Sequence, residues 1–359
     1  MFGTTAEAIK LKPVITRCIN SGGEVELWCS AQQYAELTQL SDAVALTKST
    51  TTRWLAKGFR RRSITRKLHV LPWALVATFR FIVLSVVRRS RPRLVLVHGD
   101  TLTTALGAIL ARLIGTRVGH IEAGLRSGDW RNPFPEEICR RLVGRLAHFH
   151  FAPSEIAAQN LVHTRGTIIH TNGNTVVDTL GGEFAQHDDS NHFVTTVVLL
   201  HRVELLSNHL ILEETVQVIA DHSRSHSVLL VVDALAQTHM TRILNEIIGT
   251  DCKLQITPKL PHSEFVNYLR NCQLVVTDSG GLQEEAAALG KPCILHRVVS
   301  ERDDGLGPGG NAVLTGLDPD ELRRHMDSPP TNSPVRASPE SPSDVVVRAL
   351  ANWGFLPRE

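Results

Sequence analysis

Apolar residues in this chain gather alternately in short compact runs and in longer stretches with helical spacing. The run Leu94 to His98 is the clearest strand, because it is mostly apolar and β-branched and the turn signal Gly99-Asp100 ends it. The stretch 101–114 then carries alanine and leucine at helical spacing, with Gly115 at its end. The same reading predicts strands over 24–29, 117–121 and 149–152, and helices over 135–146, 154–162 and 175–180.

The alternation stops at a stretch rich in glycine, aspartate and asparagine, 172–191, which predicts a hinge. Beyond it the pattern predicts strands over 194–200, 227–232, 254–256, 274–277 and 293–296, and helices over 210–222, 239–248, 261–271 and 282–289. A repeated strand–helix–strand order builds a parallel sheet that helices cover on both faces. The predicted fold class is therefore α/β, with two doubly wound Rossmann-like domains facing a central cleft, where a ligand is expected.

Chain length agrees with this division, since 359 residues are enough for roughly two domains of about 150 each. We expect an N-terminal Rossmann-like domain with the carboxylates discussed below and a C-terminal one that binds a nucleotide. A flexible segment rich in proline and serine and a closing helix follow. The predicted boundaries are 1–175, 176–325, 326–343 and 344–359.

Composition and local patterns exclude several other classes of protein. The six cysteines form no CxxC pair, which is typical of reduced thiols rather than of disulfides or a metal site. A formal net charge of +2 argues neither for nor against a polyanion, and no nucleic-acid partner is expected. The apolar segment 68–87 contains His69, Pro72 and Arg80, so a buried or half-buried helix is favoured over a membrane anchor. With no signal peptide after Met1, a cytoplasmic protein is expected.

The segment Thr277 to Glu285 has the character of a phosphate-binding turn. A predicted strand ends there and Ser279-Gly280-Gly281 opens a helix, whose exposed N–H groups and positive dipole attract a diphosphate. Glycine also lets the ligand approach the backbone closely. Glu284 or Glu285 lies one turn further on, where a carboxylate can accept hydrogen bonds from a ribose diol. The alternative is a tight turn with no ligand, and the sequence favours the ligand.

Three carboxylates are expected at one edge of the first sheet. Asp100 follows one strand, Glu122 follows the next, and Glu136 begins the following helix. Neighbouring carboxylates raise one another's pKa values, which suits proton transfer near neutral pH. Taken singly, each has a plain structural explanation, as a helix cap, an arginine partner or a helix-start acid. Arg126 and Arg140 can balance part of the charge.

Histidines follow two of the same strand ends. His201 and Arg202 come after the first strand of the second domain, and we expect His201 to contact the substrate or its leaving group. His98 and His120 stand just before the acids and are interpreted as structural.

These motifs together resemble those of the non-hydrolysing UDP-N-acetylglucosamine 2-epimerase family, over most of residues 1–316. The matching motifs are Phe2-Gly3-Thr4 with Glu7 to Lys10, His98 to Thr101, His120 to Arg126, Pro133 to Glu137, Gly173 to Asp178, His201-Arg202 with Glu204, Thr277 to Glu285, and Arg297 with Ser300 to Arg302. The resemblance implies the GT-B arrangement of two domains and a cytosolic homodimer that serves polysaccharide biosynthesis.

The resemblance also implies a reaction on a UDP-sugar substrate. UDP leaves carbon 1 while a proton leaves carbon 2, and the resulting 2-acetamidoglucal takes UDP back with the proton on the opposite face. The positions that match the family's catalytic residues are Asp100, Glu122, Glu136 and His201. The positions that match its UDP contacts are Lys10, Arg202, Ser279, Gly280, Gly281, Glu285 and Arg302. No metal and no cofactor are implied.

The chain departs from the family at several motifs. Thr5-Ala6 stands where the family has Arg-Pro, and Ala31-Gln32-Gln33 stands where it has Gly-Gln-His in a regulatory loop. The second departure argues against allosteric activation by substrate. Three other functions stay open: a hydrolysing epimerase that releases free sugar and UDP, a GT-B glycosyltransferase, and a catalytically silent nucleotide-sugar binder. The intact set of candidate acids makes epimerisation the leading hypothesis.

Overall fold

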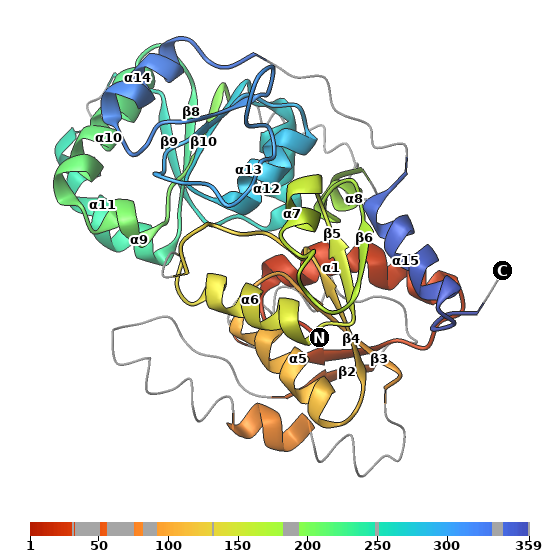
Figure 1. Cartoon of the computed structure of the whole chain (residues 1–359). Coiled ribbons are helices and arrows are strands. Elements are labelled where there is room, and N and C mark those ends of the chain that lie inside the picture. The colour runs from red at the N-terminus through yellow and green to blue at the C-terminus, as the bar shows by residue number, and fades with distance from the viewer. Residues whose placement is uncertain are drawn as a thin grey trace. The chain divides into compact units, whose positions relative to one another are not determined.

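The computed structural model describes residues 1–30, 32, 51–55, 75–81, 92–130, 133–181, 194–247, 251–331 and 340–357. It divides into two compact units. Unit 1 comprises Met1–Thr179 and Ser338–Glu359, and unit 2 comprises Leu180–Ala337. The chain therefore returns to unit 1 with its last helix, drawn in blue in Figure 1. The boundary between the two units follows Thr179, whereas the sequence pattern predicts a boundary after residue 175.

Unit 1 contains a parallel sheet of four strands in the order β3-β4-β5-β6. The strands are β3 (Leu94–His98), β4 (Arg117–Ile121), β5 (Phe149–Ala152) and β6 (Thr167–His170). A second parallel pair joins β1 (Glu26–Cys29) to β2 (Thr51–Trp54). His98 and Ile121 are register partners, so the segments that carry Asp100 and Glu122 leave the sheet at neighbouring strand ends.

Helices cover both faces of the four-stranded sheet (Figure 1). On one face, two helices share an apolar cluster with Val97 and Val118, and on the other, two helices share a cluster with Phe149 and Phe151. Burying a side chain as large as Phe151 stabilises the fold by about 2–3 kcal/mol. The helices are α5 (Leu102–Leu113) and α6 (Glu136–Leu146) on the first face, α1 (Thr5–Asn20) and α15 (Pro342–Asn352) on the second, and the short α7 (Glu155–Gln159) and α8 (Val176–Gly181).

Helix α1 continues through Pro13, a residue that normally ends or kinks a helix. Proline has no N–H, so the carbonyl of Ile9 loses its helical partner. The hydroxyl of Thr179 donates to that carbonyl at 3.2 Å and satisfies it. At the start of the helix, Thr4 and Glu7 form a reciprocal capping box. These contacts fix the helix that carries Lys10.

Unit 2 contains a parallel sheet in the order β12-β11-β10-β7-β8-β9. Successive residues of its strands point to opposite faces of the sheet. Val198 and Val276 belong to an apolar cluster on one face, and Val197 and Val275 belong to a second cluster on the other face. Near-continuous burial of strands is typical of a sheet covered by helices on both sides. The strands are β7 (Thr196–Leu199), β8 (Val228–Val232), β9 (Leu254–Pro258), β10 (Leu274–Thr277), β11 (Cys293–Leu295) and β12 (Ala312–Leu314).

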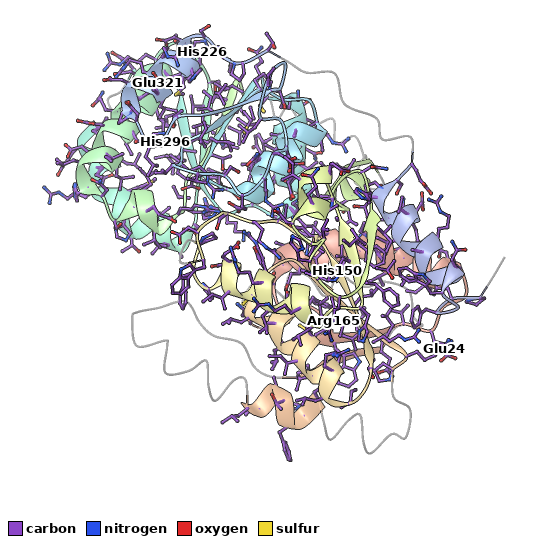
Figure 2. All side chains as sticks on the ribbon, viewed as in Figure 1. Glu24, His150, Arg165, His226, His296 and Glu321 are labelled. Carbon is purple, nitrogen blue, oxygen red and sulfur yellow. The ribbon has the colours of Figure 1, made fainter. Side chains whose placement is uncertain are left out.

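The helices of unit 2 divide between the two faces of its sheet (Figure 1). The cluster on one face draws on α9, α10, α11 and α14, and the cluster on the other draws on α12 and α13. Polar side chains are buried as well. His150 in unit 1 and His296 in unit 2, both labelled in Figure 2, are fully buried. The helices are α9 (Val203–Leu206), α10 (His209–His222), α11 (Ala234–Ile247), α12 (His262–Asn271), α13 (Gly280–Ala288) and α14 (Pro319–Asp327).

The predicted apolar segment 68–87 lies outside the described residues except for 75–81, which are helical. In the predicted flexible segment 326–343, residues 332–339 lie outside the described residues, whereas α14 ends at Asp327 and α15 begins at Pro342. Among the helices that the structure describes, none combines the length and the apolar character that a membrane span needs. The altered positions Ala31 and Gln33 also lie outside the described residues.

Candidate active site

Glu122 is the most constrained of the three predicted carboxylates. It has a φ of 64°, in the left-handed region that residues other than glycine rarely adopt. Its Oε2 atom lies 2.8 Å from Nζ of Lys10, 2.8 Å from Nδ2 of Asn174 and 3.3 Å from Nε2 of His98. Only 6% of the residue is exposed. Strained backbone held by several partners is characteristic of functional positions.

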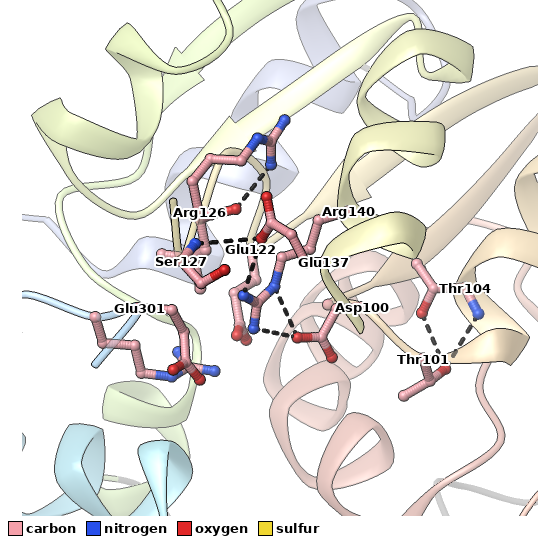
Figure 3. A network of polar contacts seen from close by, with 12 residues as sticks. Asp100, Thr101, Thr104, Glu122, Arg126, Ser127, Glu137, Arg140 and Glu301 are labelled. Atoms are coloured by element: carbon pink, nitrogen blue, oxygen red, sulfur yellow. Dashed lines mark hydrogen bonds and ion pairs between the residues drawn. The ribbon is translucent and has the colours of Figure 1, made fainter. Parts of the chain in front are cut away.

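Asp100 is held by the guanidinium of Arg140 (Figure 3). Nε and Nη2 of Arg140 donate to Oδ2 of Asp100 at 2.8 and 2.5 Å. Within the described part of the chain, no hydrogen bond reaches the other oxygen, Oδ1, and the side chain is 23% exposed. The predicted charge balance by Arg140 is confirmed, whereas Arg126 donates to the carbonyl of Leu125.

Glu136 begins α6. Burial, together with the charges of Asp100 and Glu136, raises the pKa of the Cys139 thiol to about 12. Both carboxylates are therefore near enough to Cys139 for their charges to act on its thiol. The next residue, Glu137, is fully buried and binds Arg141 at 2.8 Å, which makes it a structural acid.

Two further groups fix the turn that carries Asp100. The buried carboxylate of Glu7 accepts hydrogen bonds from the hydroxyls of Thr101 and Thr104, at 2.6 and 3.0 Å. Burial raises the pKa of Glu7. His120 donates from Nε2 to the carbonyl of Gly99 at 2.7 Å, and burial lowers the pKa of His120 to about 4. The neutral imidazole thus links β4 to this turn.

In unit 2, the predicted phosphate cradle lies where β10 leads into α13. The side chain of Ser279 makes no capping bond to the helix. A Cβ atom at Gly281 would meet only Oγ of Ser279, at 3.9 Å, so this face of the helix start is open. A Cβ atom at Gly280 would meet Nε of Arg302 at 2.8 Å. Gly281 can therefore admit a ligand, and Gly280 serves close packing.

The two faces of α13 also separate its two glutamates. Residues four apart lie on the same face of a helix, so Glu284 lies with Gly280 and Glu285 with Gly281. Glu284 is 3% exposed and ion-paired with Arg302 on the packed face. Glu285 lies on the open face. The local sequence pattern left the choice between the two glutamates open, and the family resemblance implies Glu285.

Asp278 fixes the loop that carries His201. Its buried carboxylate accepts hydrogen bonds from the backbone N–H of His201 at 2.9 Å and of Arg202 at 2.8 Å. Burial raises the pKa of Asp278. The His201 side chain is 33% exposed, with Nδ1 3.8 Å from Oδ1 of Asp278. The loop after β7 is thereby tied to the loop after β10.

Two more arginines lie beside this turn. Nη2 of Arg297 is 2.5 Å from Oε2 of Glu301, and Nη2 of Arg202 is 3.5 Å from Oε1 of the same carboxylate. Oε1 of Glu301 would also lie 3.1 Å from a Cβ atom at Gly280. Glu301 thus holds two cationic side chains close to the start of α13, where a diphosphate is expected.

A family model for UDP-N-acetylglucosamine 2-epimerase matches residues 80–342, which is more than half of the chain. The chain belongs to the UDP-N-acetylglucosamine 2-epimerase family. A family relative, the UDP-N-acetylglucosamine 2-epimerase of Escherichia coli strain K12, is 30% identical over 339 residues, covering 89% of this chain and 86% of that protein. The protein of the same name from Bacillus subtilis strain 168 is 30% identical over 333 residues, with 90% and 84% covered.

Solved structures of UDP-N-acetylglucosamine 2-epimerases have the same fold. The Methanocaldococcus jannaschii protein in complex with UDP-GlcNAc and UDP has a TM-score of 0.79 and 25% identity, with 98% of each chain covered. The Neisseria meningitidis protein bound to UDP-GlcNAc has a TM-score of 0.77 and 24% identity, with 98% of each covered. The family resemblance read from the motifs is confirmed, and so is the fold class of two Rossmann-like α/β domains of the GT-B type.

Several residues of this family member were given no role by the sequence. Asn174 and Asp278 lie inside recognised motifs, but only the structure shows that one holds Glu122 and the other the His201 loop. His262 belongs to no motif, and its contact with Glu285 was not predicted.

Among the described residues, no group of three or more His, Cys, Asp or Glu side chains is arranged to hold a metal ion.

Proposed function

We propose that this family member is a non-hydrolysing epimerase that interconverts UDP-N-acetylglucosamine and UDP-N-acetylmannosamine. The observation that carries the proposal is the pair of carboxylates at neighbouring strand ends, each already matched with a cation. Lys10 balances Glu122, and Arg140 balances Asp100. Each cation holds its carboxylate in a fixed orientation, and a carboxylate is the form of the acid that can accept a proton from a substrate.

The reaction we propose begins with removal of the proton on carbon 2 of the sugar by a carboxylate of unit 1. The electron pair of that C–H bond forms the double bond between carbons 1 and 2. The bond from carbon 1 to the diphosphate oxygen breaks, and UDP leaves with its electron pair. In the second half, UDP adds back to carbon 1 and a second acid delivers a proton to the opposite face of carbon 2. The proton count is therefore unchanged over the cycle.

The carboxylates divide this work by their environments. Oδ1 of Asp100 receives no hydrogen bond in the described part of the chain, so it is the atom we assign to proton exchange from that residue. Glu122, whose Oε2 binds Lys10 and Asn174, supplies the second group, and Glu136 supplies a third in the same region. Carbon 2 is a weak acid, so proton removal requires that the leaving diphosphate be stabilised at the same time.

We assign that stabilisation to unit 2. The N–H groups of Gly280 and Gly281 open helix α13, and the open side at Gly281 lets a diphosphate reach them. The N–H of Ser279 already donates to the hydroxyl of Thr277 at 3.0 Å, so Ser279 is proposed to contact the diphosphate through its side chain. Arg202 and His201 lie on the loop fixed by Asp278 and add positive charge or a proton donor for the departing oxygen. Glu285 accepts from the ribose. Arg302, which is ion-paired with Glu284, stays proposed as a further UDP contact. For Lys10 we propose the role of counter-ion to Glu122, with a direct contact to UDP as the alternative.

The remaining parts of the proposal follow from the family resemblance. We infer a cytoplasmic homodimer that needs no cofactor and supplies a sugar nucleotide for polysaccharide synthesis. Addition of the chelator EDTA should leave turnover unchanged, and a loss of activity with EDTA that zinc or magnesium restores would contradict the metal-independent mechanism.

Product analysis separates this proposal from its rivals. Purified protein is incubated with UDP-N-acetylglucosamine, and nucleotides and free sugars are separated by ion-exchange chromatography with mass detection. An equilibrium mixture with UDP-N-acetylmannosamine supports the proposal. Free N-acetylmannosamine with stoichiometric UDP indicates a hydrolysing epimerase instead. UDP release that depends on an added sugar acceptor indicates a transferase, and binding without any product indicates a silent binder.

A further inference from the structure

The imidazole of His262 contacts the carboxylate that faces the open side of α13. Nε2 of His262 lies 2.9 Å from Oε1 of Glu285. A carboxylate only accepts hydrogen bonds, so Nε2 carries the hydrogen and donates it. The two side chains are 20% and 13% exposed, which makes the bond stronger than it would be in open solvent. His262 begins α12, so the contact joins the start of α12 to the middle of α13.

This bond divides the carboxylate of Glu285 into two different oxygens. Oε1 is engaged by His262, and Oε2 accepts no hydrogen bond from the part of the chain that the structure describes. A carboxylate that is free to rotate loses conformational entropy when it binds a hydroxyl. A carboxylate that a neighbouring side chain already holds loses less, and its other oxygen is oriented in advance.

We propose that His262 is a positioning residue that orients Glu285 toward the ribose hydroxyls of the bound nucleotide and so contributes to selection of a ribonucleotide. The inference rests on the proposed function, because it requires a uridine nucleotide at the start of α13. It adds a residue that no family motif in this chain includes. His262 acts through Glu285 and needs no contact with the reacting carbons.

The test compares UDP with 2′,3′-dideoxy-UDP by isothermal titration calorimetry. His262→Phe keeps the bulk of the ring and removes the donor. We expect it to weaken UDP binding about 10-fold, since one hydrogen bond to a charged group is involved. Binding of the dideoxy nucleotide should change by less than about twofold, because that ligand has no hydroxyl for Glu285 to meet.

Two companion variants sharpen the comparison. His262→Gln places an amide donor near the position of Nε2, and it should restore most of the UDP affinity and of the preference for UDP over the dideoxy nucleotide. His209→Phe is the matched control: His209 also begins a helix of unit 2, α10, and lies 3.9 Å from Glu213, but both side chains are exposed. It should leave both affinities unchanged.

The outcomes separate this inference from the proposed function. If wild-type protein binds UDP and His262→Phe binds it equally well, the positioning role is wrong while the proposed function stands. If His262→Phe loses UDP and the dideoxy nucleotide to the same extent, His262 serves general packing and the inference is again overturned. If wild-type protein binds no UDP, the proposed function itself fails.

Discussion

The ammonium nitrogen of Lys10 lies 2.8 Å from Oε2 of Glu122, and both side chains are buried. Helix α1 supplies the cation and the end of β4 supplies the carboxylate, so residues 112 positions apart in sequence form one buried ion pair. A buried pair is expensive to break, because the remaining charge has no solvent to stabilise it. The family motif suggests a UDP contact for Lys10, but the structure makes Glu122 its partner.

Replacing Lys10 distinguishes these two roles. We expect Lys10→Met to reduce kcat by at least about 100-fold and to lower the free energy of unfolding by about 3 kcal/mol, because Glu122 loses its counter-charge. The Kd for UDP, measured by calorimetry, should change by less than about threefold. Lys12→Met on the same helix is the control. A large loss of UDP affinity with normal turnover of bound substrate would instead favour a direct UDP contact.

The second prediction concerns the guanidinium that holds Asp100. Arg140→Lys keeps the positive charge but cannot present two donors in a fixed plane. We expect kcat to fall about 10- to 100-fold, because the carboxylate loses its orientation. Arg141→Lys is the matched control, since Arg141 lies next to it on α6 and its side chain is 44% exposed. Steady-state kinetics in which both variants behave alike would remove the special role of Arg140.

The two glycines of the cradle should respond differently to the same substitution. In Gly280→Ala the new methyl group meets Arg302, so we expect a loss of about 1–3 kcal/mol in unfolding free energy. In Gly281→Ala the methyl group enters open space, so stability should hold and UDP binding should weaken. Thermal denaturation and calorimetry measure the two effects. A Gly281→Ala protein with wild-type UDP affinity would place the diphosphate elsewhere.

A buried histidine in unit 2 gives a pH prediction. His296 bonds the hydroxyls of Thr215 and Thr315, and burial lowers its pKa from 6.5 to about 4. Above pH 6.5 neither folded nor unfolded protein is protonated there, and the contribution to stability is fully present. Between pH 6.5 and 4 only the unfolded chain takes up the proton, so stability falls, by roughly 3 kcal/mol for this residue.

Removing that group should flatten the pH dependence. We expect the stability of His296→Gln to fall less than that of wild type between pH 6.5 and 4, in denaturant unfolding followed by circular dichroism. Part of the slope remains, since burial also lowers the pKa of His120 and His222 to about 4. His163→Gln, at an exposed position, is the control. An unchanged slope in His296→Gln would mean that His296 takes up its proton in the folded protein as readily as in the unfolded chain.

Much of the fold could be read from hydrophobic patterning. Strands β3, β4, β5 and β10 have the predicted bounds, because a compact apolar run closed by a turn signal leaves little freedom of register. The weaker elements were not predicted. β6 is partly exposed and lacks an apolar run, and α1 contains Pro13, whose missing bond is replaced by a residue far along the chain. A hydrogen bond from so distant a residue cannot be predicted from the sequence around Pro13.

For the candidate site, the sequence predicted the positions of the acids but few of their partners. Strand ends gave Asp100, Glu122 and Glu136, because topology alone brings the ends of parallel strands to one edge. Partners were harder to predict, since Asn174 reaches Glu122 across 52 positions and His262 reaches Glu285 across 23. Residues so far apart in sequence come into contact only when the helices and loops that carry them pack together. The common cleft of the two domains stays a prediction.

Hydrogen exchange at carbon 2 of the sugar tests the central claim most directly. The protein is incubated with UDP-N-acetylglucosamine in deuterated water, and carbon 2 is followed by NMR. The account predicts deuterium at carbon 2 together with formation of UDP-N-acetylmannosamine, and no exchange in Glu122→Gln, which should still bind UDP. Epimerised product that keeps its original hydrogen, or full exchange in Glu122→Gln, would contradict the assignment of these carboxylates.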